Sequence, residues 1–118
     1  MLIFHELLSM SVFQNKAVRL MATCEEGSLS DLAERQRKLL LSALELYRAI
    51  GGSFEQLEAV VMRDESEIPR RVDLVVGELM GELAAIGYLY DLDIMQAAHN
   101  TLDRRRQETA ALAVDLAG

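Results

Sequence analysis

The apolar run "VVGELMGELAAIG", residues 75–87, is the feature that most constrains the fold of this chain. Across the wider stretch 72–90, apolar side chains would occupy most of the circumference of a helix, which is typical of a helix packed on several sides. Glu78 and Glu82 interrupt the run four residues apart, and four residues advance a helix by about 400°. The two carboxylates therefore share one face of a helix that we expect to be central.

Gly77 and Gly81 repeat at the same spacing beside the glutamates. Small residues at this spacing allow another helix to approach closely, which would bring the carboxylates near that neighbour. Two interpretations of the carboxylates follow. They could line a cavity and hold a divalent cation, because Mg²⁺ and Ca²⁺ select oxygen ligands, or they could face water on the strip that the core leaves free.

The rest of the chain also favours helix over strand, since 51% of its 118 residues are hydrophobic and only one is proline. Apolar periodicity and short connections predict a single all-α domain over residues 1–118, an antiparallel four-helix bundle with one additional short helix. The expected helices span residues 2–22, 31–50, 54–62, 69–90 and 94–116.

Capping signals mark the expected helix ends. Ser28 or Ser30 could cap the helix that begins near residue 31, and the pair "GG" at residues 51–52 should end it. Ser53, with a glutamine three residues later, resembles a capping box that opens the short helix. Pro69 suits a first helical turn, and Asp91 or Asp93 could cap the last helix.

Charge and composition exclude several classes of partner. Lysine and arginine number 12 against 19 acidic residues, and the resulting net charge of −7 disfavours non-specific nucleic-acid binding. Asp73, Glu78 and Glu82 interrupt the longest apolar stretch, which disfavours a membrane span. A lone cysteine and the lack of a leader pattern predict a cytoplasmic protein. Because four helices have difficulty covering a helix that is apolar nearly all round, we expect a homo-oligomer, a dimer or tetramer.

The segment "VVGELMGELAAIGYLYDLDIMQAAHNTLDRRR" resembles the second half of a MazG-type all-α nucleoside triphosphate pyrophosphohydrolase. In that family an apolar helix with the motif Glu-x-x-Asp precedes a short turn, a "GxDL"-like start and a last helix with basic residues. The segment "LLLSALELYRAIGG" resembles the family's Glu-Glu-x-x-Glu helix, so the similarity covers roughly residues 30–108. The resemblance implies a MazG-like fold and Mg²⁺-dependent hydrolysis of a nucleoside triphosphate to monophosphate and pyrophosphate.

The resemblance also assigns positions to the metal ligands. Glu45 matches the third acid of the first motif, whose paired acids fall on Leu41 and Ser42. Glu82 matches the aspartate of the second motif, whose partner acid falls on Leu79. Several carboxylates of the family's site are therefore missing from this chain, and the strongly hydrated Mg²⁺ ion should bind weakly.

Glu78 lies one residue out of register with the second motif and is a stand-in for the missing acid. The metal candidates are therefore Glu45, Glu78 and Glu82. Each of them also has a simpler interpretation as a solvated surface acid, and Glu45 could pair with Arg48.

The last helix supplies the candidates for nucleotide and phosphate binding, because arginine forks suit phosphate oxygens. These candidates are Arg104, Arg105 and Asn100. Consecutive helical positions point about 100° apart, so at most two of the three neighbouring arginines can face one pocket. The alternative is a solvated face with salt bridges to Asp103 and Glu108.

The resemblance and its missing carboxylates imply a divergent MazG-like pyrophosphohydrolase with weak, altered or lost activity. Its ligand would be a nucleotide and its cofactor Mg²⁺, or else Mn²⁺, and no residue is assigned as the catalytic base. The alternative is a non-catalytic helical module for oligomerisation or protein interaction, or a nucleotide sensor that does not hydrolyse its ligand. Dependence on a divalent cation separates these hypotheses.

Overall fold

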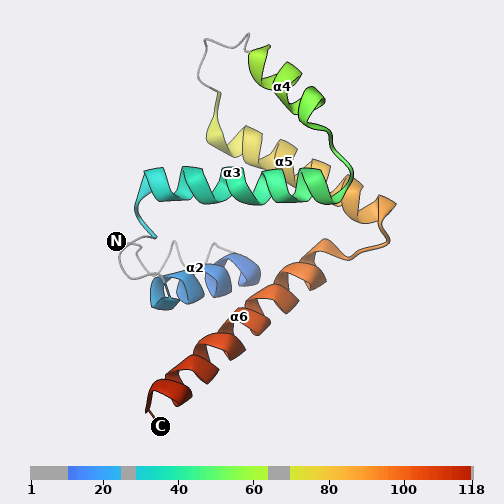
Figure 1. Ribbon diagram of the computed structural model, residues 1–118. Helices are drawn as coiled ribbons and strands as arrows, with labels where there is room; N and C mark the ends of the chain where they lie inside the picture. Colours follow the sequence, from blue (N-terminus) through green and yellow to red (C-terminus); the bar gives the residue numbers. More distant parts are fainter. Residues whose placement is uncertain (1–10, 25–28, 64–69, 118) are drawn as a thin grey trace.

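The computed structural model describes residues 11–24, 29–63 and 70–117, and this part of the chain is all helical, without a strand (Figure 1). No described helix is long and apolar enough to cross a membrane. The predicted positions of the last four helices are confirmed, whereas residues 2–10 of the first predicted helix lie outside the described residues. The helices are α2 Val12–Cys24, α3 Leu32–Ala49, α4 Phe54–Met62, α5 Val72–Leu89 and α6 Ile94–Ala117.

Helix α3 begins at a different cap from the one that the sequence suggested. The side chain of Asp31 accepts a hydrogen bond from the backbone amide of Glu34 at 3.3 Å. An aspartate at this position satisfies one of the free amides of the first turn. The prediction of Ser30 as the cap is therefore wrong, and Ser28 lies outside the described residues.

A tight corner joins α3 to α4. Gly51 has a φ of 92°, as predicted for a left-handed residue after a helix, and the amide of Gly52 bonds the carbonyl oxygen of Tyr47 at 2.8 Å. Ser53 Oγ accepts from the amide of Gln56 at 3.2 Å, which confirms Ser53 as the cap of α4. The side chain of Gln56 instead lies 3.0 Å from the Tyr47 hydroxyl, so only half of the capping box forms.

The corner between α5 and α6 also has a residue in the left-handed conformation directly after the helix, and here that residue is an aspartate. Asp91 has a φ of 55°, and the amide of Leu92 bonds the carbonyl oxygen of Gly87 at 2.8 Å. Asp93 Oδ1 accepts from the amide of Gln96 at 2.9 Å and caps α6. Of the two predicted capping aspartates, Asp93 therefore caps the helix and Asp91 makes the turn. The first turn of α5 has no side-chain cap, and Pro69 lies outside the described residues.

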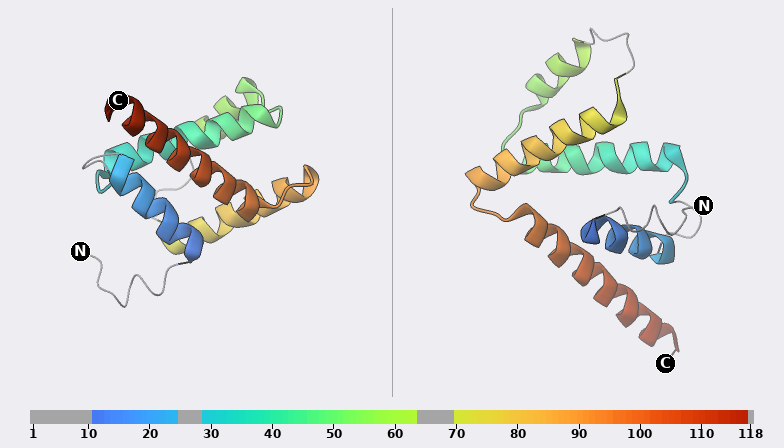
Figure 2. Two further views of the ribbon diagram at one scale, coloured as in Figure 1. Left: turned by 90° about the horizontal axis from the view of Figure 1, so that it is seen from below. Right: turned by 180° about the vertical axis from the view of Figure 1, so that it is seen from behind.

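The helices reverse direction from each one to the next, and contacts join α6 both to α2, far away in the sequence, and to its neighbour α5 (Figures 1 and 2). α2 lies along α6, and α3 lies beside α5, with α4 folding back above them. Within each packed pair the helices run parallel to one another. The described helices thus form two pairs rather than one enclosed bundle.

Little of the described chain is buried. Among its apolar side chains, Leu102 of α6 is the buried one, with 8% of its surface exposed. The chain exposes 10273 Å², about 3,900 Å² more than the roughly 6,400 Å² typical of a compact monomer of its mass. Its radius of gyration is 17.2 Å, against about 13.5 Å for a compact domain of this length.

Helix α5 shows the largest difference from the sequence prediction. Val72, Leu74 and Leu89 are 77%, 56% and 75% exposed, so the expected central position is not found within the described chain. A Cβ added at Gly77 or Gly81 would meet nothing within 4 Å, so no helix packs against the glycine stripe there. The physical reason is that α5 contacts α6 only near their shared corner and faces α3 across an open groove, so most of its circumference is uncovered.

Candidate functional site

A groove of about 330 Å³ lies between α3 and α5. We call it the α3–α5 groove. Its walls are mostly apolar, and polar groups enter it from Ser42 and Tyr47 of α3 and from Glu82 of α5. The Tyr47 hydroxyl is already used at the α4 corner, where it donates to the carbonyl oxygen of Ser53 at 2.8 Å. The groove therefore offers a ligand one carboxylate and one hydroxyl.

Three positions that the resemblance aligns with metal ligands line this groove: Ser42, Leu79 and Glu82. Their convergence follows from helical spacing, because residues three or four apart share a face of a helix. Leu41 and Glu45, the other two aligned positions, do not line the groove, and Leu41 is 45% exposed. Three of the five aligned positions therefore share the groove, and only Glu82 among these three is acidic.

The other two metal candidates lie elsewhere. Glu78 does not line the groove, and its Oε1 atom accepts from Nη2 of Arg70 at 3.4 Å with both side chains largely exposed. Glu45 is exposed on α3 and also lies outside the groove lining. Within the described residues, no group of three or more His, Cys, Asp and Glu side chains is placed to hold a metal ion.

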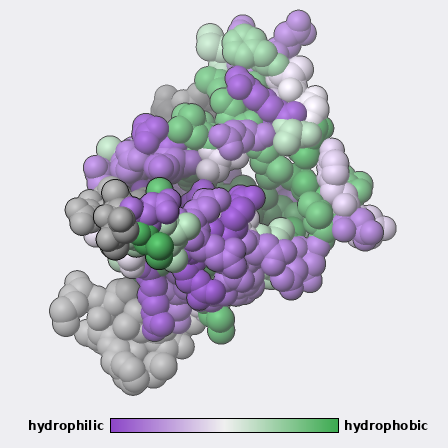
Figure 3. Space-filling view, turned by 60° about the horizontal axis from the view of Figure 1, so that its bottom comes forward, coloured by the Kyte–Doolittle hydropathy of each residue, from purple (hydrophilic) through white to green (hydrophobic). Residues whose placement is uncertain are grey.

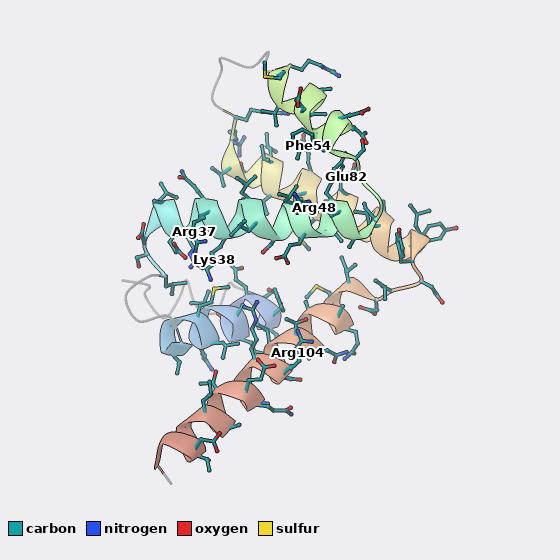
Figure 4. The ribbon with its side chains drawn as sticks, viewed as in Figure 1. Arg37, Lys38, Arg48, Phe54, Glu82 and Arg104 are labelled. Carbon is teal, nitrogen blue, oxygen red and sulfur yellow. The ribbon has the colours of Figure 1, made fainter. Side chains whose placement is uncertain are left out.

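The candidates for phosphate binding lie on α6, away from Glu82 (Figure 4). Arg104 pairs with Glu108 at 3.9 Å, and both side chains are at least 65% exposed. Asn100 accepts from the side chain of Gln96 at 2.9 Å. Arg105 is exposed. The structure therefore does not bring these three residues to the α3–α5 groove, and their surroundings match those of a solvated helix face.

A second groove, of about 470 Å³, lies between α2 and α6, and the sequence did not reveal it. Lys16 and Arg19 of α2 line it together with Arg106, so Arg106 is the member of the arginine triplet that faces a groove. Asp103 lies 3.6 Å from both Lys16 and Arg106 and offsets part of their charge. Helical spacing could have grouped Asp103 with Arg106, but not with α2, because that pairing spans most of the chain.

His99 of α6 is packed against α2. Its ring meets the ring of Phe13 edge to face, with centroids 5.6 Å apart. Nζ of Lys16 lies 3.0 Å from its Nδ1 atom. These contacts fix α2 against α6 and leave the imidazole a structural role.

One exposed ion pair perturbs titration. Arg37 donates to both carboxylate oxygens of Glu34, at 3.2 and 2.7 Å, and this hydrogen bonding lowers the pKa of Glu34 below its ordinary value. The same contact raises the pKa of Arg37. Both groups lie on the first turns of α3, outside either groove, so the pair supports the helix rather than a site.

Comparisons of the chain with protein-family models, curated proteins and solved structures found no match. The function is therefore argued from the residues and their arrangement.

Proposed function

We propose that this chain is a divergent MazG-like nucleotide pyrophosphohydrolase with weak, altered or lost activity. One observation carries the proposal: Ser42, Leu79 and Glu82, three positions aligned with the family's acids, line a single groove between two helices. Leu79 and Glu82 lie three residues apart on one face of α5, and Ser42 lies across the groove from them on α3. The proposal includes a MazG-like four-helix bundle, and a homo-oligomer that completes it.

The chemistry of the groove explains why activity would be weak. Hydrolysis of a nucleoside triphosphate needs Mg²⁺ to neutralise the phosphates and to activate water. Mg²⁺ prefers six oxygen ligands in octahedral geometry, and the groove supplies Glu82 and the hydroxyl of Ser42. Glu82 would hold the ion, and water and phosphate oxygens would fill the other positions. Mn²⁺, which accepts similar ligands, is the alternative ion.

A restored carboxylate tests this assignment. Ser42→Glu places a second acid on the groove wall, and Ser30→Glu adds the same charge outside it. We expect Ser42→Glu to raise Mg²⁺ affinity about tenfold or more, since affinity rises with ligand charge, whereas Ser30→Glu leaves it unchanged. Affinity is measured from the melting temperature as a function of MgCl₂ concentration, because an ion at ten times its Kd stabilises a protein by about 1.4 kcal/mol.

Enzymatic turnover provides the second readout. A panel of nucleoside triphosphates with Mg²⁺ or Mn²⁺ should give slow pyrophosphate release or none from the wild type, and Glu82→Gln should abolish any release. Efficient release by the wild type would contradict the proposed loss of ligands. Equal Mg²⁺ affinity in Ser42→Glu and Ser30→Glu would show that the groove is not a metal site.

A second function, a non-catalytic helical module for oligomerisation or protein interaction, is favoured by a different observation. The groove walls are mostly apolar, and the described residues contain no group of three potential metal ligands. A module of this kind would show no change in melting temperature with millimolar Mg²⁺, Mn²⁺ or nucleotide. A nucleotide sensor would instead be stabilised by a triphosphate without releasing pyrophosphate.

A further inference from the structure

The α3–α5 groove is open to solvent along apolar walls. Leu39 of α3 is 60% exposed and Leu79 of α5 is 42% exposed, although both line it. The neighbouring Leu40 and Val76 are 67% and 52% exposed. Figure 3 shows apolar side chains beside a hollow, next to a largely hydrophilic face. A continuous apolar surface of this kind is typical of an interface.

The surface that the chain as a whole exposes is large enough for an obligate dimer. The chain exposes about 3,900 Å² beyond the value for a compact monomer, whereas obligate dimers bury roughly 2,000–5,000 Å² over both partners together. If a second copy covered half of this extra exposed surface on each of the two chains, the buried area would fall within the range for obligate dimers.

The shape of the groove favours a second copy of this chain over an unrelated partner. α3 and α5 have 18 residues each and run side by side, so together they form half of a four-helix bundle. The missing half must supply two helices of about 27 Å with an apolar face. A second α3–α5 pair meets this requirement, and a twofold interface uses the same surface on both copies.

The charges of the two helices are complementary. α3 carries four basic residues, Arg35, Arg37, Lys38 and Arg48, against the two acids Glu34 and Glu45. α5 carries Asp73, Glu78 and Glu82 and no lysine or arginine, and the two arginines just before it pair with Asp73 and Glu78, which leaves a net negative charge. A pairing of α3 with α5 of the other copy would therefore bring opposite net charges together, whereas α3 on α3 or α5 on α5 would bring like charges together.

We propose that two copies of this chain associate through the α3–α5 groove, with α3 of each copy packed on α5 of the other. The four helices form a bundle that neither copy can close alone. The groove leucines make the apolar core of the interface, and the charges along the helices determine which helix meets which. The inference rests on exposure and charge and holds with or without nucleotide hydrolysis.

Leu39→Glu and Leu112→Glu form a matched pair for the test. Both replace a leucine that is about equally exposed in the single chain, 60% and 63%, but Leu112 lies on α6, outside the groove. We expect sedimentation equilibrium of the wild type to give twice the chain mass of 13.2 kDa. Leu39→Glu should raise the dissociation constant at least 100-fold, because a carboxylate would be buried without a partner, and Leu112→Glu should leave it unchanged.

A milder variant covers the case in which Leu39→Glu does not fold. Leu39→Ala keeps a strong helix former and should raise the dissociation constant about tenfold or more, with helical circular dichroism retained at high concentration. A monomeric wild type at 100 µM would overturn the proposal. A dimer that tolerates both Leu39 variants as well as it tolerates Leu112→Glu would also overturn it. Neither measurement needs nucleotide or metal. The dimer can therefore be tested even if the Ser42→Glu experiment shows no Mg²⁺ binding in the groove.

Discussion

Alanine substitution at two glycines of α5 should have opposite effects on stability. Gly87 is buried at the end of the helix, where a Cβ would lie 2.7 Å from Cγ2 of Ile94 and 3.0 Å from the carbonyl oxygen of Leu92. That backbone cannot shift freely, because the amide of Leu92 bonds the Gly87 carbonyl oxygen at 2.8 Å. Gly81 lies on the same helix, and a Cβ there would meet nothing within 4 Å.

The two effects can be given magnitudes. Alanine is more favourable than glycine in a helix by about 1 kcal/mol, so Gly81→Ala should raise the free energy of unfolding by about 0.5–1 kcal/mol. At Gly87 the same gain is opposed by overpacking, which costs about 1–3 kcal/mol, and by the weakened hydrogen bond of the corner, which costs about 1 kcal/mol. Gly87→Ala should therefore lower the free energy of unfolding by about 1–3 kcal/mol.

Urea denaturation of both variants and the wild type, followed by circular dichroism at one protein concentration, measures these changes. The midpoint should move down for Gly87→Ala and up for Gly81→Ala. A Gly87→Ala protein as stable as the wild type would refute the tight corner. Destabilisation by Gly81→Ala would mean that another helix packs on the glycine stripe, and it would place an interface there instead of at the α3–α5 groove.

Three further outcomes are expected. Asp91→Gly should stabilise the chain by about 0.5–1 kcal/mol in urea denaturation, since Asp91 has a φ of 55°, where glycine is unstrained. Tyr47→Phe should cost about 0.5–1.5 kcal/mol in the same assay, because the hydroxyl that bonds the start of α4 is lost. The Glu34 carboxyl should titrate below its ordinary pKa of 4.5 by NMR, and Arg37→Ala should return it towards that value. Because the folded pKa is the lower one, this pair stabilises the protein above pH 4.5 and loses its effect as the pH falls through the folded pKa.

The helices themselves could be predicted because their signals are local. Apolar periodicity, Ser53 before α4 and the "GG" after α3 are properties of neighbouring residues, and the observed boundaries follow them. The cap of α3 was placed too early because Ser30 and Asp31 are both good caps. The two candidates are adjacent residues, and sequence patterns do not determine the first residue of a helix to within one position.

The packing of the helices could not be predicted in the same way. The pairing of α2 with α6 joins Lys16 to His99 and Asp103, and no periodicity within either helix specifies that register. The apolar circumference of α5 predicted a helix covered on several sides, whereas Val72 and Leu74 are exposed within the described chain. Helical periodicity reports how apolar a helix is and not which element packs on it.

The two glutamates of the apolar run differ because a helix turn does not close exactly at four residues. Glu82 lines the α3–α5 groove, whereas Glu78, rotated by about 40° from it, lies outside and bonds Arg70. Leu79, the position aligned with a family acid, is rotated by about 100° from Glu78 and does line the groove. A shift of one residue therefore removes that carboxylate from the groove instead of relocating it within the groove. A rotation of α5 by about 40° would carry Glu78 to the position that Glu82 now has, and it would turn Leu79 towards the far edge of the wall.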